Sequence, residues 1–367
     1  MRRTGEKVKK SFSVSGRTEL AGNHTDHQNG RILASTIHMG LTARAEGNDS
    51  GVIRVKTQSY GSLEVQLNQL SVRPREFGSP VALIRGVAAA FKELGLDIGG
   101  FDADLRSSLP IGVGLSSSAA FSVLIGKILN DFYNNNQVDP IVIAKTAQEA
   151  ENRFFGKPCG LMSQLVCALG GTVYVDFKLR EIQRMEADFG NMGLTLCLTE
   201  TGGSHAGLDS SYARIPADMT YIANLFDKGV LADVDPAEFR AKGWDPANRP
   251  VRRAMHFFDE NERVPLMRDA LKNGDGERYM QLMNESGRSS EKLLNNIITS
   301  ATGDTKLAEG LEKSRQLLEG RGAWRVHGGG FAGCVQALMP TDYFETYKSE
   351  MEKTFGPGSC REIRLVG

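Results

Sequence analysis

Residues 110–120 read PIGVGLSSSAA, and this stretch restricts what the chain can fold into more than any other. Gly112 and Gly114 make a flexible turn, and Ser116–Ser118 stand where an apolar helix begins. A helix start has unpaired backbone N–H groups and partial positive charge, so one interpretation is a cradle for an anion such as phosphate. The alternative is a serine-capped helix after a turn. The lysine of the GxxxxGK[ST] pattern is absent.

The composition argues against several classes of partner. Lys plus Arg and Asp plus Glu both total 44, so the formal net charge is zero, whereas nucleic-acid-binding proteins usually carry a basic excess. No apolar run is long enough to cross a bilayer, and none follows the basic first residues as a secretory signal would require. The five cysteines are scattered without a CxxC pair, which predicts reduced thiols in the cytoplasm. We expect neither a nucleic-acid nor a membrane partner.

Strand and helix patterns alternate along the chain and start again near residue 190. The predicted strands cover residues 11–16, 32–47, 51–58, 63–67, 100–110, 172–177, 194–200 and 361–366, with two more around a glycine turn in 323–339. The predicted helices cover residues 80–94, 116–133, 138–155, 159–171, 208–228, 264–302 with breaks, 305–319 and 342–355. This alternation predicts an α+β protein of two domains, 1–190 and 191–367.

Two other stretches combine glycines with polar residues: GRTELAGNHTDHQNG (16–30) and HGGGFAGC (327–334). Together with GLSSSAA, in this order and at these spacings, they resemble the three signature motifs of the GHMP kinases and look most like galactokinase. The first is similar to the galactokinase signature GRxNxIGEHTDYxxG, and the last to GGGFGGC with Ala332 in place of a glycine. AENRFFGKPCGLMSQ and MNESGRSS also resemble galactokinase stretches.

The resemblance implies the two-domain GHMP kinase fold, with a ribosomal-protein-S5-like N-terminal domain, a ferredoxin-like C-terminal domain and a ligand cleft between them. It also implies phosphorylation of a hexose at the anomeric hydroxyl, with ATP and Mg²⁺ as cofactors. The expected partners are a small-molecule sugar and ATP, and the expected state is a monomer or weak homo-oligomer.

The family motifs assign roles to residues that handle phosphate. The predicted contacts to ATP are Gly112, Gly114, Leu115, Ser116, Ser117, Ser118 and Ala119. Ser118 and Glu151 match the magnesium ligands, and oxygen ligands suit this hard cation. The alternative for Glu151 is a solvated charge on a helix. Arg17 resembles an arginine near the transferred phosphoryl group, where a fixed cation stabilises developing charge.

The motifs also suggest how a sugar is held. The predicted contacts are Asn23, His24, Asp26, Gly160 and Tyr212. An ionised carboxylate accepts hydrogen bonds from neighbouring hydroxyls, which suits Asp26 to this role. The rival interpretations of this loop are a metal site formed by His24, Asp26 and His27, or a surface Asx-turn. The alternative for Tyr212 is a core tyrosine.

Several positions depart from the galactokinase pattern. Ser163 stands where G[IL]MDQ has the aspartate that takes the proton from the attacking hydroxyl, and a lost base typically costs about 100- to 10,000-fold in rate. Asn23 replaces a glutamate that contacts the C6 hydroxyl, so one hypothesis is a sugar altered at C6, such as a uronic acid. Glu19 replaces an asparagine, and its role is open: it could pair with Arg17 or partly restore the lost carboxylate. Residues 78–86 hold no aromatic side chain to stack on adenine.

The lost base leaves two hypotheses of different classes. The first is an ATP-dependent sugar kinase, because phosphoryl transfer depends mostly on positioning and charge neutralisation. The second is a galactokinase-like regulator that binds sugar and ATP without catalysis. The serine loop and Glu151 favour the enzyme, since a sensor has less need of a magnesium ligand.

Overall fold

The computed structural model describes residues 9–110, 114–203, 207–298 and 303–366. The chain forms two compact units that are interleaved in sequence. The first unit contains residues 1–17, 36–111 and 115–170, and the second contains 18–35, 112–114 and 171–367. Strands and helices are mixed in both units, so the α+β prediction is confirmed. The domains 1–190 and 191–367 are a division along the sequence and stay a prediction.

The first unit is built on a twisted sheet in the order β4-β3-β5-β2, with β1 beside β2. The strands are β1 (Lys10–Ala21), β2 (Arg31–Asn48), β3 (Val52–Thr57), β4 (Gly61–Gln66) and β5 (Gly100–Ser107). Strand β3 runs parallel to β5, and β2 runs antiparallel to β5. Alternate residues such as Ala43, Val55 and Phe101 are buried, as a sheet with one covered face requires.

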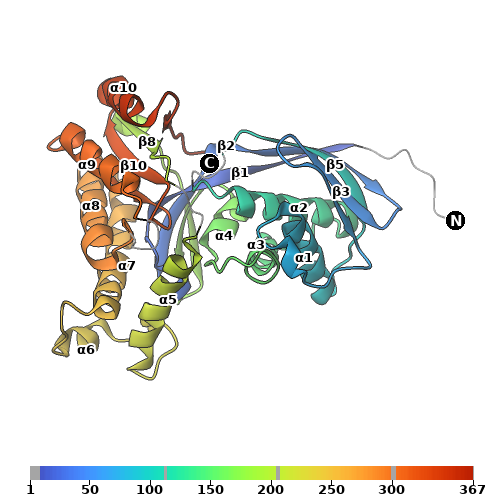
Figure 1. Cartoon of the computed structure of the whole chain (residues 1–367), viewed down its shortest axis with the longest axis horizontal. Helices are drawn as coiled ribbons and strands as arrows, with labels where there is room; N and C mark the ends of the chain where they lie inside the picture. The colour runs from blue at the N-terminus through green and yellow to red at the C-terminus, as the bar shows by residue number, and fades with distance from the viewer. Residues whose placement is uncertain (1–8, 111–113, 204–206, 299–302, 367) are drawn as a thin grey trace. The chain divides into compact units, whose positions relative to one another are not determined.

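Four helices cover the buried face of this sheet, as Figure 1 shows. They are α1 (Pro80–Glu93), α2 (Ser117–Tyr133), α3 (Pro140–Glu149) and α4 (Met162–Leu169). Helix α3 continues directly into a π-helical turn, Ala150–Phe155. A Cβ added at Gly86 of α1 would lie 2.6 Å from the Cα of Ala150, so the two segments pack closely.

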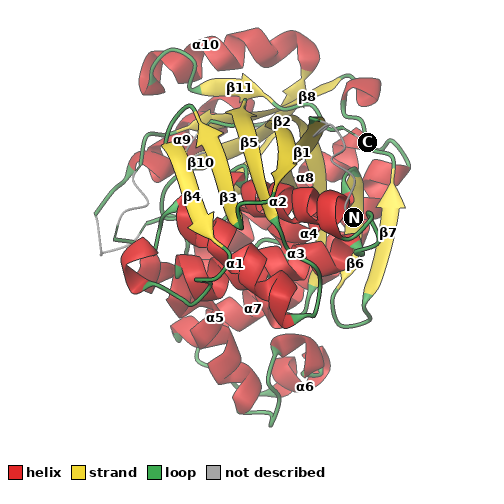
Figure 2. Ribbon diagram, turned by 90° about the vertical axis from the view of Figure 1, so that its right-hand side faces the viewer, coloured by secondary structure: helices red, strands yellow, loops and turns green. Residues whose placement is uncertain are grey.

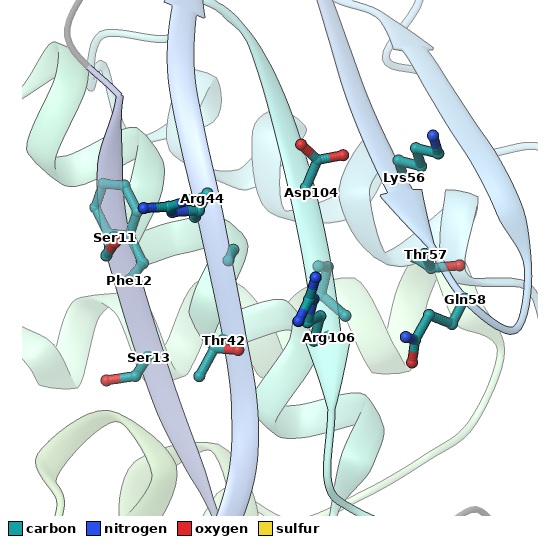
Figure 3. A pocket seen from close by; sticks show the side chains of 12 residues that line it. Ser11, Phe12, Ser13, Thr42, Arg44, Lys56, Thr57, Gln58, Asp104 and Arg106 are labelled. Carbon is teal, nitrogen blue, oxygen red and sulfur yellow. The ribbon is translucent and has the colours of Figure 1, made fainter.

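The other face of the same sheet is open and polar (Figure 3). It forms a hollow of about 910 Å³ whose lining includes Arg44, Lys56, Asp104 and Arg106. None of the predicted site residues lines this hollow. We interpret it as a solvated sheet face, because charged side chains of both signs alternate with buried residues along each strand.

The second unit contains an antiparallel sheet in the order β11-β8-β10-β9. Its strands are β8 (Leu194–Glu200), β9 (Ala323–His327), β10 (Cys334–Pro340) and β11 (Cys360–Glu362). Helices α9 (Lys306–Leu318) and α10 (Phe344–Phe355) bury Leu318, Tyr347 and Met351 against β8 and β10. Figure 2 shows α10 beside β11 and β8. Strand β6 (Thr172–Asp176) pairs with residues 31–35 and with β7 (Glu181–Met185).

A second core in this unit joins helices to the glycine-rich third motif. The helices are α5 (Asp209–Asn224), α6 (Pro236–Ala241), α7 (Arg249–Lys272) and α8 (Gly276–Ser289), followed by a π-helical turn, Ser290–Leu294. Phe331 and Ala332 pack in this core with Met219 and Phe257. The apolar part of HGGGFAGC therefore anchors its glycines to the helices.

Most of the predicted elements are present, and the differences have local causes. Helix α7 begins at Arg249, before the expected Val264, because its first half buries Val251, Phe257 and Phe258 in the core, and Pro265 lies inside the helix. The short elements β7 and α6 were not predicted. The last strand, predicted over residues 361–366, is shorter in the structure, where β11 ends at Glu362. All five cysteines are free thiols. Among the described residues, no helix combines the length and apolar character that crossing a membrane demands.

Candidate active site

The predicted site residues fall into two groups, one in each unit. Arg17, residues 115–119, Glu151, Gly160 and Ser163 belong to the first unit. Gly114, Asn23, His24, Asp26 and Tyr212 belong to the second. Gly112 lies outside the described residues. We call Arg17, Ser116, Ser118, Glu151, Ser163 and Gln164 the serine cluster.

The start of helix α2 is not capped by its own serine. Ser116 precedes the helix with a φ of 62°, a left-handed conformation that is uncommon for residues other than glycine. Its side chain makes no capping hydrogen bond, and its Oγ instead donates to Ser163 Oγ at 3.1 Å. Leu115 and Ala119 are buried, so only their backbone groups are available to a ligand. The serine-capped alternative is therefore wrong, and the anion-cradle interpretation is favoured.

Ser118 and Glu151 lie in direct contact. Ser118 Oγ donates to one Glu151 carboxylate oxygen at 2.7 Å, and Gln164 Nε2 donates to the other at 2.7 Å. Glu151 is only 3% exposed, so the interpretation as a solvated helix charge is wrong. It lies in the π-helical turn after α3, a distortion that is frequent at functional sites. A hydroxyl and a buried carboxylate side by side fit the oxygen ligands that Mg²⁺ prefers.

Arg17 places its guanidinium on Ser163. Its Nε and Nη2 donate to Ser163 Oγ at 3.2 and 2.8 Å, and Arg17 is 7% exposed. Ser116 donates to the same oxygen. Three donors point at one hydroxyl oxygen, which leaves it no lone pair with which to accept a substrate proton. The geometry therefore agrees with the prediction that Ser163 is not a base. Gly160 lies three residues before it, in the segment that leads into α4.

In the second unit, the amide of Asn23 is fully used by the protein. Its Nδ2 donates to Glu19 Oε1 at 3.2 Å and to the carbonyl of Gly328 at 2.7 Å. Its Oδ1 accepts from Ser290 Oγ and Asn296 Nδ2, both at 3.2 Å. An amide has two N–H donors and two acceptor lone pairs, so this side chain is saturated. Asn23 is 1% exposed, and the structure favours a positioning role over a direct sugar contact.

Glu260 holds the loop that contains Asn23, and sequence reasoning missed it. Its carboxylate is fully buried and accepts from the backbone N–H groups of Gly22 at 3.1 Å and Asn23 at 3.3 Å. Ser286 Oγ donates to it at 2.9 Å, and Arg263 forms an ion pair with it. Burial raises the pKa of this carboxyl, but the neighbouring cations, Arg263 first, outweigh that effect and bring the pKa to about 2. One sequence signal could have identified Glu260. It stands three residues after Phe257, where the helical period predicts an apolar residue.

His24 is held by both ring nitrogens. It has a φ of 58°, its Nε2 lies 3.1 Å from the carbonyl of Gly329, and its Nδ1 lies 3.2 Å from His27 Nε2. A carbonyl only accepts, so the proton of His24 is on Nε2. Burial lowers the pKa of His24 to about 4, which keeps the ring neutral at pH 7. Among the described residues, no group of three or more His, Cys, Asp and Glu side chains could hold a metal ion, which disfavours the rival site of His24, Asp26 and His27.

Asp26 and Tyr212 are half-buried, as are His24 and Gly160 among the predicted sugar contacts. Asp26 Oδ1 accepts from the backbone N–H of His27 at 2.9 Å, so part of its carboxylate closes a local turn. Tyr212 Oη donates to the carbonyl of Gly330 at 2.7 Å. A Cβ added at Gly329 would lie 2.7 Å from the tyrosine ring, which explains a glycine there. The structure thus brings the first motif, the third motif and Tyr212 together within the second unit.

Comparisons with known proteins agree with this arrangement. The model of the GHMP kinases N-terminal domain matches residues 82–171, and the galactokinase galactose-binding signature matches residues 2–46. The fold is similar to Lactococcus lactis galactokinase complexed with galactose, with a TM-score of 0.86 at 21% identity over 98% of this chain and 94% of that one.

Two further solved structures share the fold. Methanococcus jannaschii mevalonate kinase matches with a TM-score of 0.65 at 17% identity over 100% of both chains. A D-glycero-D-manno-heptose 1-phosphate kinase from Bacteroides thetaiotaomicron matches with a TM-score of 0.62 at 15% identity over 98% of this chain and 97% of that one. The chain thus carries a GHMP kinase N-terminal domain and the galactokinase galactose-binding signature on the two-domain GHMP kinase fold, which confirms the predicted resemblance to GHMP kinases of galactokinase type.

Proposed function

We propose that this protein is an ATP-dependent sugar kinase that phosphorylates a hexose at its anomeric hydroxyl. The observation that carries the proposal is the buried carboxylate of Glu151, which accepts from Ser118 in the first turn of a helix that Ser116 does not cap. A buried acid in contact with the first turn of a helix has a clear use when a divalent cation and a phosphate group share the site. The galactokinase signature at residues 2–46 supports a sugar as the acceptor.

In this proposal Ser118 and Glu151 hold Mg²⁺, with phosphate oxygens and water as the remaining ligands. When bound, the cation neutralises charge on the phosphoryl group being transferred. The backbone of Gly114–Ser118 binds the phosphates. Arg17 supplies a fixed positive charge, and Ser163, which also accepts from Ser116, accepts from its guanidinium.

The proposed reaction does not depend on a carboxylate base at position 163. Phosphoryl transfer passes through a loose transition state, so positioning and electrostatics provide most of the acceleration. We expect turnover to be slower than in an enzyme with aspartate at this position, because general base catalysis typically contributes about 100- to 10,000-fold.

The proposed sugar lies against the loop of residues 23–27, with Asp26 accepting from ring hydroxyls and Tyr212 beside it. We extend the proposal to hexoses altered at C6, including uronic acids. The support is electrostatic: the amide at position 23 is neutral and the neighbouring carboxylate of Glu19 is paired with Arg325, so an acidic C6 group is repelled less than by a carboxylate at position 23 itself. Thermal-shift screening across hexoses and hexuronates tests this, and a large shift with galactose alone would contradict it.

A coupled ADP-release assay with MgATP and the same sugar panel tests the kinase itself. We expect sugar-dependent ADP release. A second candidate is a regulator that binds sugar and ATP, and the observation that favours it is the serine at the position of the catalytic aspartate. Sugar binding by calorimetry with no ADP release in the presence of MgATP would support the regulator and reject the kinase.

A further inference from the structure

Two departures from the galactokinase signature are related to each other. The signature GRxNxIGEHTDYxxG has asparagine two residues after its arginine and glutamate directly before its histidine. In this chain the two residue types are exchanged, with Glu19 at the first position and Asn23 at the second. Asn23 Nδ2 lies 3.2 Å from Glu19 Oε1 and 3.5 Å from Oε2, so the exchanged residues contact each other.

The carboxylate of Glu19 has a cation beside it. Glu19 is 2% exposed, and its Oε1 lies 3.3 Å from Nη2 of Arg325, which is 1% exposed. The same Nη2 donates to the backbone carbonyl of Glu19 at 2.9 Å. Gln336 fixes the guanidinium by accepting from its Nε at 2.9 Å. This charge pair is buried, and its hydrogen bonds hold it in one geometry.

The hydrogen bonds continue from Arg325 back to Asn23. Arg325 Nη1 donates to Ser286 Oγ at 3.2 Å, and Ser286 donates to Glu260 at 2.9 Å. Glu260 accepts from the backbone N–H of Asn23, whose side chain donates to Glu19. These five residues, Glu19, Asn23, Glu260, Ser286 and Arg325, therefore form a closed ring, which we call the loop network.

We propose that Glu19 and Asn23 act as one exchanged acid–amide pair that positions the sugar-binding loop. The exchange keeps one carboxylate and one amide in contact and puts the carboxylate beside Arg325. Both are positioning residues: Glu19 is a structural partner of Arg325, not a replacement for the catalytic base. The two departures are a single compensated change, and each residue is tolerated because of the other.

A double-mutant cycle of Glu19→Asn and Asn23→Glu tests the pairing through the melting temperature, which does not depend on any activity. Asn23→Glu buries two carboxylates in contact, so we expect the lowest melting temperature for this variant. Adding Glu19→Asn removes one of the two charges and raises the melting temperature again. A double variant that melts below both single variants would show two independent residues and overturn the proposal.

Glu19→Gln gives a second test that does not require Asn23→Glu to fold. Glutamine keeps an oxygen to accept from Asn23 but loses the charge opposite Arg325. The kinetic readout of this test rests on the proposed sugar kinase function. We expect the sugar KM to rise about tenfold, which equals about 1.4 kcal/mol, with kcat within threefold of the wild type and a larger rise in KM for Glu19→Ala. A kcat loss of 100-fold or more with an unchanged sugar KM would make Glu19 the base and overturn the proposal.

A failure of the sugar kinase proposal can be distinguished from a failure of the Glu19–Asn23 pairing. If the wild-type protein releases no ADP with any sugar, the sugar kinase proposal fails, and the melting-temperature cycle still decides whether Glu19 and Asn23 are coupled. Sugar affinity by calorimetry then replaces KM for Glu19→Gln. We expect weaker sugar binding by about tenfold, and an unchanged affinity would contradict a positioning role.

Discussion

The serine cluster of the first unit and the loop network of the second unit differ in how their polar groups are held. The serine cluster uses small hydroxyls, one buried carboxylate and one guanidinium, and its hydrogen bonds converge on Ser163 and Glu151. The loop network is a closed ring of buried charged groups, two acids and one arginine among them. In the first group the departure from the galactokinase pattern, Ser163, removes a reacting group. In the second group the departures compensate each other.

Departures from a family pattern therefore do not all have the same meaning. Ser163 replaces a charge by a hydroxyl that accepts from Arg17, and no carboxylate takes the place of the missing one among the hydrogen bonds of Ser163 that the structure describes. Glu19 and Asn23 keep both functional groups and exchange their positions. We therefore expect changes in the serine cluster to alter rate and changes in the loop network to alter stability and sugar affinity.

The largest expected effect is on stability, from Glu260→Ala. This change leaves the N–H groups of Gly22 and Asn23 unsatisfied and Arg263 without its buried partner, so we expect a loss of about 3–5 kcal/mol in the free energy of unfolding. Urea unfolding measures it. Glu262→Ala on the same helix is the control, because Glu262 is exposed and pairs with Arg240, and it should cost about 1 kcal/mol or less. Equal losses would remove the contrast between the two regions.

Glu151→Gln tests the serine cluster. The variant keeps the shape of the side chain but loses the charge proposed to bind Mg²⁺, so kcat/KM should fall about 100- to 1,000-fold. More Mg²⁺ should be needed for half-maximal rate, while the melting temperature should fall less than with Glu260→Ala. Glu149→Gln is the matched control, since Glu149 lies two residues before Glu151, at the end of α3, and pairs with Arg153 at the surface. If both variants keep full activity, Glu151 does not hold the metal.

Ser163→Asp should increase turnover about tenfold or more, because it supplies the missing base. The gain is limited by Arg17, whose Nε and Nη2 would both face the new carboxylate and lower its pKa. Ser163→Asn is the control, since it has nearly the same shape as aspartate and no basicity. Steady-state ADP release compares the two. Equal rates in both variants would indicate that the pocket has been rebuilt around a different chemistry.

The smallest expected effect is a change in the pH dependence of stability. Burial lowers the pKa of His24 to about 4, so the unfolded chain binds a proton that the folded chain rejects between pH 6.5 and 4. Stability from this group is complete above pH 6.5 and is lost as the pH falls through that range. His24→Asn is a suitable variant because asparagine tolerates the left-handed backbone at this position. It should reduce the slope of the free energy of unfolding against pH by up to about 1.4 kcal/mol per pH unit. Unfolding in urea at pH 7.5, 6 and 5 checks this, and an unchanged slope would contradict a buried neutral His24.

The motif residues could be identified from the sequence, with roles that remain predictions, whereas the residues around them could not. Arg17, Ser118, Glu151 and Ser163 lie within recognisable motifs, and the structure brings them together in one unit. Glu260 and Arg325 were missed because they reach the loop across about 240 to 300 residues of chain, and nothing local marks such a contact.

The same limit explains what was misread in the fold and the loop. The helix was expected from Val264, but packing of α7 against α5 and α8 starts it earlier and carries it through Pro265. Asn23 was interpreted as a sugar contact from its position in the motif, and only the surrounding hydrogen bonds show that its amide is saturated. Local chemistry is readable in sequence, whereas satisfaction of a buried group is decided by distant partners.

We expect the wild-type serine cluster to transfer phosphate to a sugar although position 163 carries no base. Incubation with MgATP labelled at the γ-phosphate and a hexose, followed by phosphorus NMR of the product, measures this directly. The account predicts that the label appears on the anomeric oxygen, as a hexose 1-phosphate, and that the signal is lost with Glu151→Gln. Label that remains on ATP, under conditions where calorimetry shows both ATP and sugar bound, would contradict it.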